Sequence, residues 1–197
     1  MTDVPDLDTI RAGVTARPPR IAPPIDGVKH AAVAIVVAPG ARGPELLFIE
    51  RAHHPHDPWS GDMAFPGGRR DPGDADISDT ARRETLEETG VALGPPTARL
   101  DDYDARSGRR PWPLVVTPFV HLVDRRPETT PNHEVETIVW IPLADVLDPV
   151  RVTRHRFPRA GVRVVVPALR HERFVIWGMT HRMLGTFTES FGHPLPE

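Results

Sequence analysis

The chain of 197 residues contains no cysteine and no long apolar run. The absence of cysteine excludes disulfide scaffolds, thiolate zinc sites and cysteine nucleophiles. The longest purely apolar run covers residues 31–38, whereas a membrane-spanning helix needs roughly 20 apolar residues, so we expect no membrane association. The N-terminus carries Asp3, Asp6 and Asp8 and lacks the basic start and apolar stretch of a signal peptide. These features predict a cytoplasmic protein.

A large excess of one charge sign is also missing, because the formal net charge is -3. Such a chain has no overall field that would attract nucleic acid, so we expect no nucleic-acid partner. The single lysine, Lys29, lies outside any Walker-type phosphate loop, and no serine lies in the glycine pattern of a nucleophile elbow. Hydrophobic residues make up 39% of the chain, which is enough for one substantial core.

Proline and glycine divide the chain. Leu7, Ile10 and Val14 lie at helical spacing, and four prolines follow them before residue 25. We therefore predict a short helix and an extended proline-rich linker over residues 1–27, followed by one domain over residues 28–197.

The domain contains more predicted strands than helices. Strands are expected at residues 31–37, 46–49, 99–104, 114–123, 135–141, 162–166 and 174–176, and residues 61–73 are expected to form a glycine- and proline-rich loop. Helices are expected at residues 78–89, 143–147 and 179–187. Strands and helices do not alternate one for one, which favours an α+β fold with a mixed sheet.

Three glutamates on the helix at residues 78–89 carry the densest chemistry. Glu84, Glu87 and Glu88 are spaced i, i+3 and i+4, so they share one face within one turn. Like charges at this spacing repel, and the C-terminal end of a helix disfavours anions. Divalent cations would offset this cost, since Mg²⁺ binds carboxylates while keeping other sites for water and phosphate oxygens. A solvated acidic helix face is the alternative, and the spacing alone leaves both open.

The segment resembles the Nudix box, whose pattern is G-x5-E-x7-R-E-U-x-E-E-x-G-U with U a bulky apolar residue. The second half of the pattern is matched by Arg83, Glu84, Glu87, Glu88, Gly90 and Val91. The first half matches if one extra residue lies between Gly68 and Arg83, so that Asp74 takes the place of the box glutamate. That longer spacing, after Phe65-Pro66-Gly67-Gly68, is similar to the coenzyme A diphosphatase branch of the Nudix hydrolases.

The resemblance implies a Nudix-type α/β/α sandwich with a mixed sheet over residues 28–197, and a small-molecule nucleotide as substrate. It implies Mg²⁺ or Mn²⁺ as cofactor, with metal ligands at Gly68, Glu84, Glu87 and Glu88. It also implies catalytic roles for Arg83, Glu84, Glu87 and the downstream Glu134. Whether a box glutamate or Glu134 is the general base stays open, as does the choice between monomer and homodimer.

Substrate contacts are expected from Phe65 and Arg69 around the glycine pair, and from Arg51 and His53 upstream. The branch has further arginines near Arg51, where this chain has His53, His54 and His56. The favoured substrate is coenzyme A or acyl-CoA, cleaved to adenosine 3',5'-bisphosphate and (acyl-)phosphopantetheine. The alternative is another nucleoside diphosphate derivative, namely an ADP-sugar, a dinucleoside polyphosphate or a nucleoside triphosphate. A non-catalytic Nudix binding module is less favoured, because all three box glutamates are present.

Overall fold

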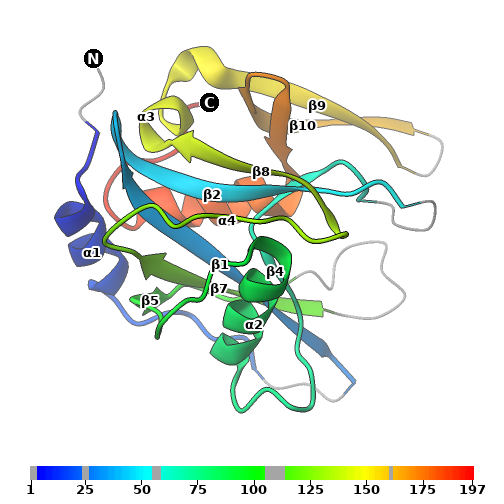
Figure 1. Ribbon diagram of the computed structural model, residues 1–197. Helices are drawn as coiled ribbons and strands as arrows, with labels where there is room; N and C mark the ends of the chain where they lie inside the picture. The colour runs from blue at the N-terminus through cyan, green and yellow to red at the C-terminus, as the bar shows by residue number, and fades with distance from the viewer. Residues whose placement is uncertain (1–3, 24–26, 55–58, 105–113, 160–161) are drawn as a thin grey trace.

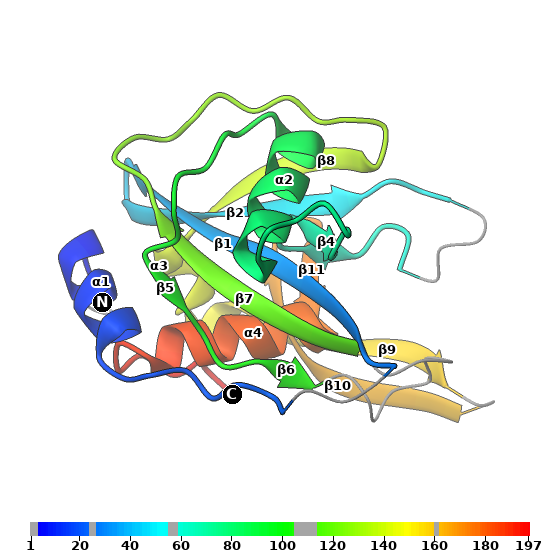
Figure 2. The same ribbon diagram turned by 90° about the horizontal axis from the view of Figure 1, so that it is seen from below.

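The computed structural model describes residues 4–23, 27–54, 59–104, 114–159 and 162–197. A central sheet lies between helix α2 (Ile77–Thr89) and helix α4 (Gly178–Glu189), which cover opposite faces (Figures 1 and 2). The expected α+β fold with a mixed sheet is confirmed. Across the described part of the chain, no helix is long and apolar enough to cross a membrane.

Strand β1 (Lys29–Gly40) organises the central sheet. It runs parallel to β7 (Leu114–Leu122) and antiparallel to β2 (Gly43–Arg51) and to the short glycine strand β4 (Gly67–Arg69). Ala32 of β1 is paired with Gly68, whereas Val37 is paired with Leu46 of β2. The glycine strand therefore lies against the first half of β1, where β2 has diverged from it.

The remaining strands of this sheet are short or peripheral. Strand β2 also pairs with β3 (Met63–Ala64) and β8 (Val135–Pro142), and β7 pairs with β5 (Ala98–Arg99) and β6 (Tyr103–Asp104). The sequence predicts one strand at residues 99–104, but the structure has two strands of two residues. The physical reason is that Asp101 and Asp102 turn to the N-terminal segment. Asp101 accepts hydrogen bonds from Arg17 and Arg20, and Asp102 accepts one from the Ala22 N–H.

Alternation along β1 creates two core layers. Ala32, Ala34, Val36 and Ala38 pack with Ala81 of α2, where the small side chains allow the helix to approach closely. Ile35 and Val37 belong to the larger layer on the other face, which includes three buried residues of α4: Met183, Leu184 and Phe187. Helix α1 (Leu7–Thr15) contributes Ile10 and Val14 to this same layer.

A second, antiparallel sheet contains β9 (Val152–Arg159), β10 (Val162–His171) and β11 (Phe174–Trp177). It follows helix α3 (Leu143–Val146) and a 3-10 turn at Pro149–Arg151. The sequence predicts no strand at residues 152–159 and one at residues 162–166, whereas β9 covers the first range and β10 continues to His171. Figure 2 shows the β9–β10 hairpin extending beyond α4. Strand β11 leads directly into α4, so residues at the end of β11 and the start of α4 lie beside the central sheet.

Candidate active site

Two adjacent glycines form the floor of the site. Gly67 has a φ of 151°, a conformation that favours glycine, and a Cβ there would collide with the Ala32 carbonyl oxygen. A Cβ on Gly68 would collide with the carboxylate of Glu84. The glycine pair therefore allows β4 to lie directly against the Glu84 side chain. Helix α2 begins at Ile77, with Asp74 in the preceding loop, and this arrangement agrees with the register that has one extra residue before Arg83.

Helix α2 is well terminated at both ends. Asp76 caps its N-terminus by accepting from the Ser78 and Asp79 N–H groups, and Asp79 accepts from the Asp76 N–H in return. Gly90 ends the helix in the left-handed conformation, with a φ of 73°. The local sequence thus fixes where the helix starts and ends, and thereby where its glutamates lie.

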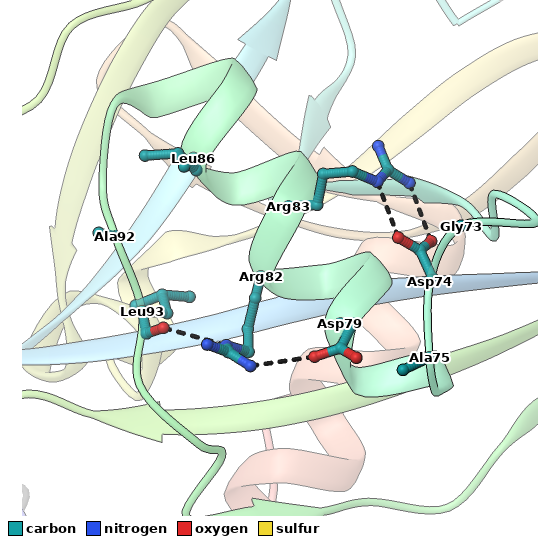
Figure 3. Close-up of a pocket in the computed structure, with 9 residues that line it drawn as sticks. All are labelled: Gly73, Asp74, Ala75, Asp79, Arg82, Arg83, Leu86, Ala92 and Leu93. Carbon is teal, nitrogen blue, oxygen red and sulfur yellow. Dashed lines mark hydrogen bonds and ion pairs between the residues drawn. The ribbon is translucent and has the colours of Figure 1, made fainter.

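Arg83 is bound chiefly to Asp74 rather than to a glutamate. Its Nε and Nη2 donate to the two carboxylate oxygens of Asp74 at 3.0 and 3.1 Å (Figure 3). Its Nη1 donates to Glu84 at 2.9 Å and to Glu87 at 3.3 Å, and Nη2 also donates to the Arg69 carbonyl at 3.2 Å. This network lowers the pKa of Asp74 and raises that of Arg83. Arg83 therefore ties the loop before α2 to both the glycine strand and the glutamates.

Glu88 is the most deeply buried of the three glutamates, at 3% exposed. Its Oε2 accepts a hydrogen bond of 2.8 Å from the Gly67 N–H. The pKa of Glu88 is raised to about 8, chiefly by burial and further by the charges of Glu84 and Glu134, although the Gly67 N–H and Arg51 oppose the shift. Burial also raises the pKa of Glu84, against the opposing effect of Arg83. Negative charge around Glu88 is thus incompletely balanced.

Glu87 has a different environment. Its side chain is 53% exposed, and it contacts Arg83 from the solvent side. Across the described residues, no three His, Asp or Glu side chains converge closely enough to hold a metal ion in this arrangement. The hydrogen bonds account for this, because Arg83 donates to Glu84 and Glu87, whereas the Gly67 N–H donates to Glu88.

A cavity of about 630 Å³ opens beside Glu84 and Glu88. Seven of the residues expected from the sequence line it, namely Arg51, Phe65, Gly68, Arg69, Glu84, Glu88 and Glu134. The Ala52 N–H donates to the Glu134 carbonyl at 2.9 Å, which holds the Glu134 loop next to the end of β2. The structure therefore brings residues from four distant segments around one cavity.

Three expected site residues are not among those that line the cavity. Arg83 and Glu87 belong to the hydrogen-bond network described above, which reaches the cavity through Glu84. His53 is exposed, and its ring lies near Gly61 rather than in the cavity. The structure gives no support for a substrate contact by His53 in this arrangement. His56, from the same histidine run, lies outside the described residues.

Several lining residues were not expected from the sequence. Asp62, Trp177, Met179 and Met183 all line the cavity, and the last three come from the end of β11 and the first two turns of α4. Their positions depend on how the second sheet packs against the central one. The sequence signal was an apolar helical spacing at residues 179–187, which predicts burial but not a binding site.

A second hollow, of about 410 Å³, lies on another side of α2 (Figure 3). Arg82 donates there to the Leu93 carbonyl at 3.0 Å and to Asp79 at 3.0 Å, and Arg83 faces Asp74. These charged side chains are satisfied by one another. The glutamates Glu84 and Glu88 face the larger cavity, which is the better candidate for the active site.

A family model of the NUDIX domain matches residues 28–160. The chain therefore belongs to the Nudix family and is a Nudix hydrolase. It is 32% identical to the mitochondrial coenzyme A diphosphatase NUDT8 of Homo sapiens over 174 residues, which cover 86% of this chain and 70% of the human protein. It is also 38% identical to an uncharacterized protein of Schizosaccharomyces pombe over 117 residues, 56% of this chain but 36% of that protein.

The fold is similar to that of solved Nudix structures. The NUDIX domain of Shewanella oneidensis NrtR, complexed with ADP ribose, matches with a TM-score of 0.50 at 22% identity, over 62% of this chain and 78% of that domain. At this identity the match concerns the fold alone.

Proposed function

We propose that this hydrolase cleaves the diphosphate linkage of coenzyme A or acyl-CoA, giving adenosine 3',5'-bisphosphate and (acyl-)phosphopantetheine. The observation that carries the proposal is the cavity itself, which joins a buried and a half-buried glutamate, two arginines and an extended apolar wall. The similarity to the human coenzyme A diphosphatase supports it. We assign the activity to residues 28–197, with residues 1–27 as an N-terminal helix and linker.

Nudix hydrolases generally use divalent metal ions, and the donor set fits Mg²⁺ or Mn²⁺ in chemical type. Carboxylate oxygens are hard ligands, and the raised pKa of Glu88 indicates a place where a further positive charge is favourable. The residues that would hold the ion are Glu84, Glu87, Glu88 and the Gly68 carbonyl. Bound there, the ion would supply neutralisation of the diphosphate and activation of water.

The protein's own side chains have three further tasks. Arg83 positions Glu84 and Glu87, and it would shift its contacts towards Asp74 when those carboxylates turn to a cation. Arg51 and Arg69 bind phosphate oxygens at the mouth of the glutamate cluster. Glu134 lines the cavity with 60% of its side chain exposed, so it can take a proton from water and pass it to solvent. Phe65 lines the cavity and stacks on Phe48, with the ring centroids 4.7 Å apart.

The test is a substrate panel with coenzyme A, 3'-dephospho-coenzyme A, ADP-ribose and diadenosine polyphosphates, each with Mg²⁺ and with Mn²⁺. We expect coenzyme A to give the highest kcat/KM. Arg51→Ala should narrow the ratio of kcat/KM between coenzyme A and its 3'-dephospho form. The change in this ratio should correspond to about 1.5–3 kcal/mol of transition-state stabilisation, the range for a hydrogen bond to a charged group. Arg154→Ala, at an exposed position on β9, is the matched control and should leave the ratio unchanged. Preference for ADP-ribose or a diadenosine polyphosphate would instead support the alternative nucleoside diphosphate substrates.

A further inference from the structure

The cavity has two chemically different ends. One end holds Glu84, Glu88 and Glu134. The other, which we call the apolar arm, is lined by Phe65, Leu114, Val116, Trp177, Met179 and Met183. Four of these side chains are buried, and those of Trp177 and Met179 are partly exposed. Such a lining favours a neutral, largely apolar group over a charged one.

Trp177 gives the apolar arm a fixed wall. Its indole Nε1 donates to Asp62 at 2.9 Å, and its ring stacks on His155 with the centroids 4.2 Å apart. Phe157 lies beside it at 4.9 Å. The neighbouring Arg173 of the β10–β11 turn binds Glu50 of β2 through two hydrogen bonds of 2.7 and 2.6 Å. The second sheet is therefore fastened to the central sheet on both sides of this wall.

One positive charge lies with the glutamate end, and a second lies at the border between the two ends. Among the described residues that line the cavity, the cationic ones are Arg51 and Arg69. Arg51 is close enough to Glu88 to lower its pKa. Arg69 directly follows Gly68, and because Ala31 pairs with both Arg69 and Val116, its side chain lies on the same sheet face as Val116, at the border between the two ends. A phosphate dianion placed against leucine, valine and methionine would lose its hydration without compensation. The nucleotide half of coenzyme A, with its 3'-phosphate, is therefore better matched by the arginines than by the apolar arm.

Resting on the function proposed above, we propose that the apolar arm binds the phosphopantetheine half of the substrate and the first part of an acyl chain on its thiol. The pantetheine moiety is neutral and flexible, and an acyl chain adds only methylene groups. Met179 and Met183 suit chains of different length, because unbranched thioether side chains adapt to irregular apolar shapes. The arm would make Trp177, Met179 and Met183 specificity-determining residues for the acyl group.

Binding of the two product halves tests this assignment without turnover. 4'-Phosphopantetheine and adenosine 3',5'-bisphosphate are titrated separately into the protein with Mg²⁺, and tryptophan fluorescence is recorded for the wild type and Trp177→Phe. We expect phosphopantetheine to change the emission, and Trp177→Phe to remove at least half of that change. Octanoyl-phosphopantetheine should bind about tenfold more tightly than the free thiol form. A signal from Trp177 on binding of adenosine 3',5'-bisphosphate instead would place the nucleotide in the arm and overturn the proposal.

A charge introduced into the arm gives a second readout. Met179→Glu should weaken binding of phosphopantetheine at least tenfold and change binding of adenosine 3',5'-bisphosphate less than twofold. Val165→Glu, at a position 45% exposed on β10, adds the same charge outside the cavity and should affect neither ligand. Equal weakening of both ligands by Met179→Glu would indicate a general electrostatic effect and overturn the proposal. Tight phosphopantetheine binding without hydrolysis of coenzyme A would refute the proposed activity but support the arm.

Discussion

Asp74, in the loop before α2, and Glu88, in the last turn of α2, are two buried carboxylates, at 9% and 3% exposed. Asp74 accepts two hydrogen bonds from Arg83, one of 2.9 Å from the Asp71 N–H and one of 2.7 Å from the Thr80 hydroxyl. Glu88 accepts one, from the Gly67 N–H. The pKa of Asp74 is lowered accordingly, whereas that of Glu88 is raised to about 8.

This difference distinguishes a carboxylate that stabilises a loop from one that we propose as a metal ligand. Asp74 has all the positive charge and donors that an ionised carboxylate needs, so its charge stabilises the loop before α2. Glu88 is buried near other carboxylates and lacks an equivalent cationic partner. Its ionised form therefore destabilises the metal-free protein and would be stabilised by a bound cation. Sequence similarity to the Nudix box places both residues in one motif, and only their surroundings distinguish them.

The pH dependence of stability should differ between these two carboxylates. Because the pKa of Glu88 is raised in the folded protein, its contribution to stability is present below about pH 4.5 and is lost as pH rises to about 8. Each pKa unit corresponds to about 1.4 kcal/mol, so the loss should be roughly 3–5 kcal/mol. Urea denaturation of the metal-free protein should show Glu88→Gln to be more stable than the wild type at pH 8, with the difference vanishing near pH 4. A constant difference over this range would contradict the raised pKa.

Activity should respond in the opposite direction. Glu88→Gln keeps the shape and burial of the side chain but removes the negative charge that a divalent cation requires, so we expect kcat with saturating Mg²⁺ to fall at least about 10²-fold. Steady-state kinetics on coenzyme A would measure this. Thr188→Ser, a change at a buried position near the far end of α4, serves as a control for mild core perturbation. Near wild-type turnover of Glu88→Gln would remove Glu88 from the metal site.

Replacement of Asp74 should weaken folding. Asp74→Asn loses the charged pairing with Arg83, and we expect the free energy of unfolding at pH 7 to fall by about 2 kcal/mol, since Arg83 is partly exposed. The lowered pKa means that this contribution is present above about pH 3.8 and is lost as pH falls through the value in the folded protein. The variant and the wild type should therefore converge in acid. If they differ as much at pH 2 as at pH 7, the pairing is not the cause.

The sequence predicts most of the fold where local signals are strong. Helix α2 is correct to within one residue, because Gly90 ends it and apolar and charged residues alternate with helical spacing before it. Strand β9 is missed, because Arg154, Arg156 and Pro158 weaken its strand pattern. What holds β9 in place is pairing with β10 and the stacking of His155 on Trp177. Neither contact can be read from local sequence.

The site shows the same division. The spacing of Glu84, Glu87 and Glu88 and the glycine pair predict which residues meet, and the structure brings Gly68, Glu84 and Glu88 to one cavity. The partner of Arg83 is not predictable from spacing, because Asp74 reaches it through the path of a loop. The apolar arm is not predictable either, since it forms only where α4 and β11 pack beside β7.

The smallest effect is expected when Glu87 is replaced. This substitution compares an exposed carboxylate with the buried Glu88 on the same helix face. Its side chain is 53% exposed and makes one hydrogen bond of 3.3 Å to Arg83, so its loss should change the free energy of unfolding by at most about 0.5 kcal/mol. Water screens an exposed carboxylate, and it therefore contributes less to holding a cation than a buried one. We expect Glu87→Gln to lower kcat about tenfold, clearly less than Glu88→Gln, and to raise the Mg²⁺ concentration needed for half-maximal activity. A loss as large as that of Glu88→Gln would mean that Glu87 turns fully inwards when substrate and metal bind, and that the contact with Arg83 belongs only to the resting protein.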